Sequence, residues 1–273
     1  MKLHPIDEAV ALNALAEGQY AGKSCQGYWN MVGPFGGTTA ATAMNAVLLH
    51  PARLGEPIAL TVNYAGAMAS GPFTVSAIPA RTNRSTQHWA IELSQADPAG
   101  ASQVVLTASA VTAARRETWG VNDTPMPAVP PPKDFLRLKR GGGVEWVKRY
   151  EMRFVTGEVP TQWDGQGDDS LTQLWMRDDP PRVMDFNSLT ALADVFFPRA
   201  WLRRATRVPA GTVSMTVYFH ADSAQLAASG KGYVLGQARA QAFRKGFFDQ
   251  TAQLWNEGGI LLATTHQIVY FKE

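Results

Sequence analysis

Two polar residues in the second half of the sequence, Asp194 and Gln267, have the side chains needed to activate a water molecule. Asp194 lies in the segment SLTALADVFF, where helical spacing places it at the margin of an apolar stripe formed by Leu189, Leu192, Ala193, Phe196 and Phe197. A carboxylate there is partly desolvated, which raises its pKa above about 3.9 and makes it a better base near neutral pH. An exposed Asp on the flank of the helix also fits this pattern.

Gln267 occurs in a predicted strand, where alternation puts it on the same face as Thr265 and Val269 and opposite His266. Its amide donates and accepts hydrogen bonds at once, so it can orient a water molecule while Asp194 removes a proton. A solvent-facing amide is the alternative interpretation. Thr212 can hold the same water through its hydroxyl, although a β-branched residue in a strand needs no such role.

The elements that must position these residues occur twice in the same order, which indicates an internal repeat. In the first half, Gly36-Gly37 precede a predicted helix over 38–49 that His50-Pro51 end, and strands begin near Pro57, Phe73, Thr86 and Ser102. In the second half, a helix over 188–197 follows the candidate caps Asn187 and Ser188 and stops at Pro198, and strands begin near Thr212, Tyr233, Phe247 and Ile260.

Local sequences also correspond between the halves. The segment Thr61-Val62-Asn63-Tyr64 matches Thr216-Val217-Tyr218-Phe219, and the turn 97–100 matches the turn 256–259. The proline-rich stretch TPMPAVPPPK and the glycines 141–143 lie between them. We therefore predict an α+β chain with a first unit over residues 1–123, a linker over 124–143 and a second unit over 144–273.

The second half contains, in chain order, the segments SLTALADVFFPRAW, GTVSMTVYFH and GGILLATTHQIVYF. These segments resemble the C-terminal unit of acyl-CoA thioesterases of type II, which are double-hotdog proteins. FGGTTAATAMNAVLLHP likewise resembles the helix of their first unit, so the similarity covers nearly the whole chain. The resemblance implies two fused hotdog units, each a long helix wrapped by an antiparallel sheet. It also implies an acyl-CoA thioesterase that needs no cofactor and no metal ion, with Asp194, Thr212 and Gln267 binding and activating the hydrolytic water.

This resemblance suggests roles for residues around the predicted base. Gly36 and Gly37 precede a helix, so their N–H groups can stabilise an oxyanion, although a glycine pair also suits a tight turn. Arg199 and Arg203 belong to a basic cluster after the Asp194 helix and can meet the phosphates of coenzyme A, although a solvated basic loop is the alternative. Ser214 replaces an Asp that is frequent in the family, which bears on the range of substrates.

Composition excludes several other classes of function. The net charge of +2 comes from scattered residues, which gives no field for nucleic acid, and no apolar run approaches the roughly 20 residues of a membrane span. The single cysteine, Cys25, and an N-terminus without a signal-like apolar stretch predict a cytoplasmic protein. Exposed sheet edges, together with the association known for members of the family that the chain resembles, predict a homo-oligomer. The resemblance also implies a role in lipid metabolism. Motifs for serine hydrolases, zinc enzymes and dinucleotide sites are missing.

Two alternatives to a thioesterase remain at the level of sequence. A hotdog enoyl-CoA hydratase or dehydratase acts on the same kind of substrate, but the Asp/His or His/Glu pair of those families is not found. A non-catalytic acyl-CoA-binding protein is the other alternative, because a fold does not guarantee turnover.

Overall fold

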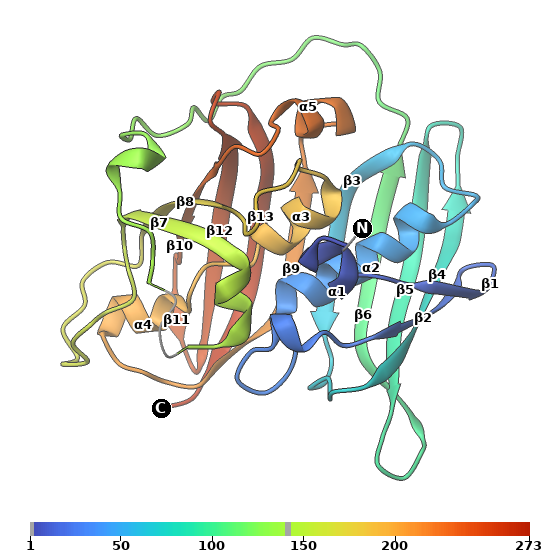
Figure 1. Ribbon diagram of the computed structural model, residues 1–273, viewed down its shortest axis with the longest axis horizontal. Coiled ribbons are helices and arrows are strands. Elements are labelled where there is room, and N and C mark those ends of the chain that lie inside the picture. Colours follow the sequence, from blue (N-terminus) through green and yellow to red (C-terminus); the bar gives the residue numbers. More distant parts are fainter. Residues whose placement is uncertain (1–2, 140–142) are drawn as a thin grey trace.

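A single antiparallel sheet runs through both halves of the molecule. The structure is a computed structural model that describes residues 3–139 and 143–273. Over those residues the sheet has 13 strands in the order β1-β2-β4-β5-β6-β3-β9-β13-β12-β10-β8-β7, with β11 paired to β12. Figure 1 shows the first-half strands on one side, the second-half strands on the other, and α1, α2 and α3 across one face.

Each half contains a pair of strands, then a long or short helix, and then the remaining strands of its part of the sheet. The first half contains α1 (Pro5–Ala9), β1 (Asn13–Ala16), β2 (Gln19–Lys23), η1 (Gln26–Tyr28), α2 (Gly36–Leu49), β3 (Glu56–Tyr64), β4 (Pro72–Thr82), β5 (Thr86–Ala96) and β6 (Ser102–Ala113). After η2 (Pro132–Asp134) and η3 (Glu145–Arg149), the second half contains β7 (Tyr150–Thr156), β8 (Thr172–Asp178), α3 (Phe186–Leu192), α4 (Arg199–Arg204), β9 (Ala210–Phe219), α5 (Ser223–Ala228), β10 (Val234–Arg239), β11 (Phe243–Arg244), β12 (Phe247–Asn256) and β13 (Leu261–Phe271).

The two halves meet where β3 pairs with β9. Thr61 lies directly opposite Thr216 in this antiparallel pair, and their hydroxyl oxygens are 3.0 Å apart. These are the residues that correspond in the sequence repeat, so the repeat relates the two halves about an approximate two-fold axis at this point. The predicted double-hotdog, α+β architecture is confirmed.

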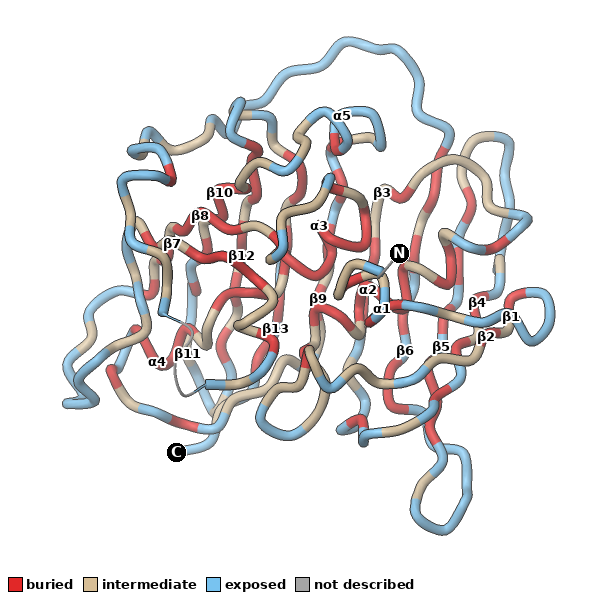
Figure 2. The backbone as a smooth tube through the Cα atoms, viewed as in Figure 1, coloured by how far each residue is buried: buried red, intermediate tan, exposed pale blue. Residues whose placement is uncertain are grey.

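Helix α2 is enclosed by protein on nearly all sides. Its central apolar residues are fully buried, namely Ala40, Ala41, Ala43, Met44, Ala46 and Val47. A helix that is apolar all round belongs in a core, and small alanine side chains allow α3 and the sheet to approach its backbone closely. Figure 2 shows buried backbone along α2, α3 and the strand centres, with exposed backbone at the loops.

Residues 114–131 connect the halves without a helix or strand. In Figure 1 this segment arches over one edge of the sheet. Two indole N–H groups of the second half hold it, because Trp255 donates to the carbonyl of Thr124 and Trp175 to that of Pro130. The predicted limits of the units at residues 123 and 143 stay predictions.

The structure corrects the predicted helix over 188–197. Helix α3 begins at Phe186 and ends at Leu192, so Asp194 lies in the turn that follows. The cap is Asp185, whose carboxylate accepts the N–H of Ser188 at 2.8 Å, instead of Asn187 or Ser188. A carboxylate one turn earlier satisfies the free N–H groups of the helix start, which is why the helix begins sooner.

Sequence patterns also missed several elements. The strand pairs β1–β2 and β7–β8 and the short helices α1, α4 and α5 were not predicted, whereas the eight predicted strands begin within two residues of the observed positions. Helix α2 starts two residues earlier than predicted and includes Gly36 and Gly37. Within the described chain, no helix is both long enough and apolar enough to span a membrane.

Candidate active site

Asp194 lies where the second half meets the start of the first-half helix. Its carboxylate contacts the first turn of α2, because a Cβ placed on Gly36 would lie 2.8 Å from Asp194 Oδ2. The backbone N–H of Gly37 also lies near enough to favour the charged form of this carboxylate. Helix N-termini carry partial positive charge and free N–H groups, so the position suits a negatively charged side chain.

Gln267 and Thr212 form a hydrogen-bonded chain that ends at this carboxylate. Gln267 on β13 is buried, and its Nε2 donates to Asp194 Oδ1 at 2.9 Å. The Thr212 hydroxyl on β9 donates to Gln267 Oε1 at 3.3 Å. As alternation predicted, Gln267 shares a face with Thr265 and Val269, opposite His266. That face is buried and His266 is exposed, which excludes the solvent-facing alternative. The structure therefore brings the three predicted residues together.

A β-bulge gives Thr212 its orientation. Gln267 pairs with Met215 across β13 and β9, but Val269 pairs with Thr212 because the register shifts in between. Without the extra residue, alternation from buried Met215 would turn Val213 inward and Thr212 outward. Instead, Val213 is exposed and Thr212 lies on the side of Gln267.

Burial makes Asp194 a base suited to neutral pH. Desolvation raises the pKa of Asp194 to about 7, against the smaller lowering effects of the hydrogen bond from Gln267 and of the nearby Gly37 N–H. A group with this pKa is substantially ionised at neutral pH and still accepts a proton readily.

Tyr64 is a residue of this site that sequence patterns did not single out. Its hydroxyl donates to the carbonyl oxygen of Gly36 at 2.9 Å. Desolvation, with a smaller effect of the Asp194 charge, holds the pKa of Tyr64 well above its usual value. The repeat offered one signal, because Tyr64 corresponds to Phe219 and so only the first half has a hydroxyl there.

The site opens into a cavity of about 930 Å³ lined by both halves. Asp194, Gln267, Thr212, Gly36 and Tyr64 all lie in its wall. Much of the rest is aromatic, including Phe35, Trp146, Phe196, Phe197, Trp201 and Phe248. Phe35 and Trp146 stack with ring centroids 4.3 Å apart. An apolar cavity with a few polar groups at one point is the usual form of a small-molecule site.

Charged groups are sparse in this wall. Among the lining residues that the structure describes, the charged ones are Asp194 and two exposed cations, Lys139 and Arg207. Arg207 lies over the ring of Trp201 at 6.0 Å. The buried amide of Gln250, opposite Gln267 across β12 and β13, also faces the cavity and makes no hydrogen bond to the described residues. It is available to a ligand.

Arg199 and Arg203 lie away from the cavity wall, which does not fit their predicted contact with phosphates. Arg199 is fully buried, and its guanidinium donates to the carbonyl oxygens of Phe197 and Ser170 and to the Thr172 hydroxyl. Desolvation lowers the pKa of Arg199 to about 9. Arg203 is exposed and donates to the carbonyl of Gly167. Both residues belong to the short helix α4, and their side chains lie on faces of this helix that do not line the cavity.

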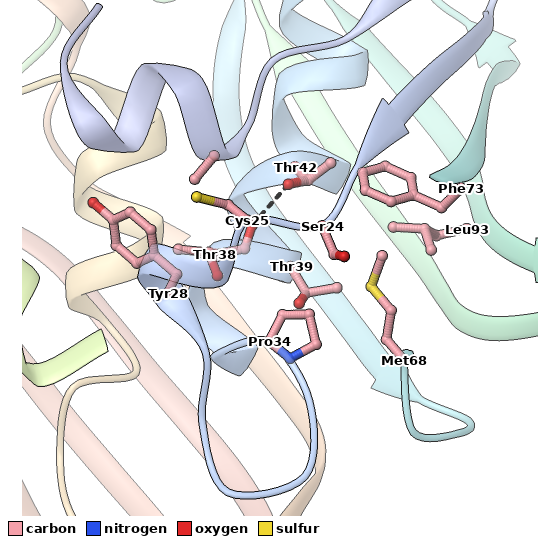
Figure 3. Close-up of a pocket in the computed structure, with 11 residues that line it drawn as sticks. Ser24, Cys25, Tyr28, Pro34, Thr38, Thr39, Thr42, Met68, Phe73 and Leu93 are labelled. Atoms are coloured by element: carbon pink, nitrogen blue, oxygen red, sulfur yellow. Dashed lines mark hydrogen bonds between the residues drawn. The ribbon is translucent and has the colours of Figure 1, made fainter. Parts of the chain in front are cut away.

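Cys25 lines a separate pocket of only about 20 Å³, shown in Figure 3. The pocket is large enough for roughly one water molecule. Its polar lining consists of hydroxyl groups and the thiol, and the Thr42 hydroxyl donates to the Thr38 carbonyl. No histidine or carboxylate lines it among the described residues, so Cys25 has no base beside it. Nor do the described residues gather three potential metal ligands anywhere.

Comparisons with solved structures identify the fold. A hot dog protein of unknown function from Alicyclobacillus acidocaldarius is 44% identical, with a TM-score of 0.93 over 100% of this chain and 99% of that one. The acyl-CoA thioesterase II TesB2 from Mycobacterium marinum is 17% identical, with a TM-score of 0.77 over 98% of both chains. The dehydratase domain of PpsC from Mycobacterium tuberculosis, in complex with C12:1-CoA, is 12% identical, with a TM-score of 0.55 over 99% and 100%.

Comparison with protein families distinguishes between the thioesterase and the dehydratase among these similar structures. Comparison with curated proteins found no match. Residues 25–113 match the acyl-CoA thioesterase N-terminal domain, and residues 121–271 match the acyl-CoA thioesterase C-terminal domain. Together the two domains account for most of the sequence and contain all the residues of the site. The chain therefore belongs to the acyl-CoA thioesterase family of thioester hydrolases.

Proposed function

We propose that this protein hydrolyses an acyl-CoA to a free acid and coenzyme A by means of water that Asp194 activates. The observation that carries the proposal is a carboxylate of pKa about 7, oriented by Gln267, in the wall of a largely apolar cavity. Water that is deprotonated by a base of this kind can attack a thioester without a nucleophilic side chain or a metal ion.

The reaction proceeds in two steps. The Asp194 carboxylate removes a proton from water while the water oxygen bonds to the thioester carbon and the carbonyl electrons move onto oxygen. The tetrahedral intermediate then collapses, the carbon–sulfur bond breaks, and the thiolate of coenzyme A leaves. Asp194 returns to the carboxylate by giving its proton to the departing thiolate, so the products are the free acid and coenzyme A.

The first turn of α2 is suited to stabilise the intermediate. Gly36 lines the cavity, and its N–H belongs to the first turn, where backbone N–H groups lack partners within the helix. An oxyanion beside it also gains from the helix dipole. The N–H of Gly37 already favours the charged form of Asp194, so we assign Gly37 to the base and Gly36 to the oxyanion.

Gln267 and Thr212 orient the base in this mechanism. Gln267 Nε2 donates to Asp194 and its Oε1 accepts from Thr212, so both polar atoms of the amide already have protein partners. We therefore assign them the task of fixing the Asp194 carboxylate, with Oδ2 turned toward the water, instead of the predicted task of binding that water directly.

Coenzyme A carries several phosphate charges, which require cations at the cavity. Arg207 and Lys139 are exposed and belong to the cavity wall, in contrast to Arg199 and Arg203. We assign the phosphate contacts to Arg207 and Lys139. The acyl chain then occupies the aromatic and aliphatic part of the cavity. Cytoplasmic location, a role in lipid metabolism and a homo-oligomeric state stay predictions.

The dehydratase alternative finds less support. A dehydratase of this fold needs a histidine beside its carboxylate, and the described cavity wall contains none. A binding protein without turnover remains the competing class, and an assay distinguishes the two.

The direct test is thiol release from acyl-CoAs of increasing chain length by the wild-type protein and by Asp194→Asn. The amide keeps the shape and the hydrogen bond from Gln267 but cannot take the proton. We expect release to fall by roughly 10³-fold or more, with acyl-CoA binding and the circular dichroism spectrum retained.

Asp123→Asn is the matched control, because Asp123 is exposed in the segment 114–131 that connects the halves. It should hydrolyse at the wild-type rate. Undiminished release by Asp194→Asn would remove Asp194 from the mechanism, and the failure of the wild-type protein to release thiol from any acyl-CoA would favour the binding protein.

A further inference from the structure

The Tyr64 hydroxyl and the Asp194 carboxylate come from different halves of the chain and meet at one glycine. A Cβ on Gly36 would lie 2.8 Å from Asp194 Oδ2 and 3.3 Å from Tyr64 Oη. The two oxygens therefore stand close to the same point on the cavity wall, within reach of a single bridging water molecule. Because Gly36 has no side chain, both oxygens stay open to the cavity that Gly36, Tyr64 and Asp194 line.

The hydrogen atom of the Tyr64 hydroxyl is already engaged. It points to the Gly36 carbonyl oxygen, 2.9 Å from Tyr64 Oη. A phenol oxygen that donates its hydrogen still accepts through its lone pairs. Tyr64 is also kept protonated, because burial raises its pKa. It therefore offers a fixed acceptor to the cavity.

Asp194 likewise presents one oxygen to this space. Gln267 occupies Oδ1, and no other side chain among the described residues hydrogen-bonds to the carboxylate. Attack by water needs one O–H directed at the base and a lone pair directed at the thioester carbon, and an acceptor for the second O–H fixes the water in that orientation. Asp194 Oδ2 supplies the first acceptor, which leaves the second O–H for another group.

We propose that Tyr64 is a catalytic residue, whose oxygen accepts the second hydrogen of the water that Asp194 deprotonates. The inference rests on the proposed function. It adds a side chain of the first half to the backbone contribution of Gly36, since Tyr64 ends β3, the strand that pairs with β9 of the second half.

Methanol separates this role from a structural one. Water has two O–H bonds, whereas methanol has one, and its methyl group would point at the acceptor. In methanolysis the methanol oxygen bonds to the acyl carbon, Asp194 takes the methanol proton, the carbon–sulfur bond breaks, and the thiolate leaves with a methyl ester as the other product. Only hydrolysis gains from the second acceptor.

The experiment measures free acid and methyl ester formed from one acyl-CoA in aqueous methanol, by mass spectrometry, for the wild-type protein, Tyr64→Phe and Tyr218→Phe. Tyr218 is an exposed tyrosine of β9 and serves as the matched control. For Tyr64→Phe we expect hydrolysis to fall by about 10- to 100-fold and the ester-to-acid ratio to rise at least fivefold. Tyr218→Phe should match the wild type in both.

The ratio is taken within one sample, so partial unfolding does not alter it. A ratio in Tyr64→Phe within twofold of the wild type, or below it, would overturn the assignment. So would the loss of both products from a folded variant, because one lost hydrogen bond to water leaves residual turnover. If Asp194→Asn has also lost thiol release, the failure concerns Tyr64 alone and the proposed function stands.

Discussion

Gly36 in the first half leaves just enough room for Asp194 of the second half. A Cβ on Gly36 would lie 2.8 Å from Asp194 Oδ2, although no positive φ requires glycine at this position. The glycine therefore provides space at the site and is not needed for the backbone. The two residues join the halves at the point where the chemistry is proposed.

Gly36→Ala should impair turnover and spare the fold. The added methyl group pushes the carboxylate or the Tyr64 hydroxyl from its position, and we expect kcat to fall by about 10- to 100-fold. Gly37→Ala is the contrasting variant, since its Cβ would lie 2.6 Å from the backbone oxygen of Ala191 and should destabilise the packing of α2 on α3. Steady-state kinetics and thermal unfolding of both variants check this, and wild-type kcat in a folded Gly36→Ala would contradict it.

The rate should rise with pH through the pKa of Asp194. The carboxylate is the active form and the pKa of Asp194 is about 7, so kcat/KM should increase up to neutrality and level off above about pH 8. The measurement is thiol release across pH 5 to 9, compared between an acyl-CoA and a short acyl-pantetheine thioester, which has no phosphate that titrates in this range. A profile that is flat from pH 5 upward would show that the base has an ordinary carboxylate pKa.

The same carboxylate should cost stability at high pH. Its pKa is raised on folding, so the folded state binds the proton more tightly, and this contribution, present in acid, is lost as the pH rises through about 7. Asp194→Asn stays neutral and should melt a few degrees above the wild type at pH 8, with the difference closing near pH 4. Equal melting temperatures at both pH values would contradict the burial of the charge.

Gln267→Ala should change both the rate and its pH dependence. The Gln267 amide stabilises the charged form of Asp194, so its removal raises the pKa of Asp194 further and moves the rising limb of the profile to higher pH. We expect kcat at pH 7 to fall by about 10- to 100-fold. Gln253→Ala on the neighbouring strand β12 is the control and should leave the profile unchanged. A lower midpoint in Gln267→Ala would oppose the assigned hydrogen bond.

Arg207→Ala should weaken binding of coenzyme A through its phosphates. For an exposed cation we expect KM to rise by about fivefold at low salt and less at high salt, with kcat unchanged. A short acyl-pantetheine thioester lacks the phosphates and should show no change. Arg203→Ala, outside the cavity wall, is the control. An equal rise in KM for both substrates would place Arg207 at another part of the ligand.

Arg199→Met should destabilise the fold. The buried guanidinium forms no ion pair among the described residues, but its removal leaves the carbonyl oxygens of Ser170 and Phe197 without their donor. We expect a loss of about 2 to 4 kcal/mol in denaturant unfolding, against about 0.5 kcal/mol or less for the exposed Arg203→Met. Equal stability of the two variants would contradict this role.

The repeat, most of the strands and the strand face that carries Gln267 could be predicted from the sequence alone. Periodicity places side chains on faces, so spacing predicted Gln267 and His266 on opposite faces, while the fold showed that the Gln267 face is the buried one. The polar margin of the α3 segment likewise singled out Asp194. These features depend only on residues that are close together in the sequence, so they can be predicted from it.

Which residues meet at the site depends on how the two halves pack. The β3–β9 pairing brings Gly36 and Tyr64 of the first half to Asp194, and a bulge in β9 turns Thr212 inward against simple alternation. The packing of α4 buries Arg199, whose charge in the sequence suggested an exposed anion contact. The cause is the same throughout, because contacts between residues far apart in the chain follow from packing the two halves and not from local periodicity.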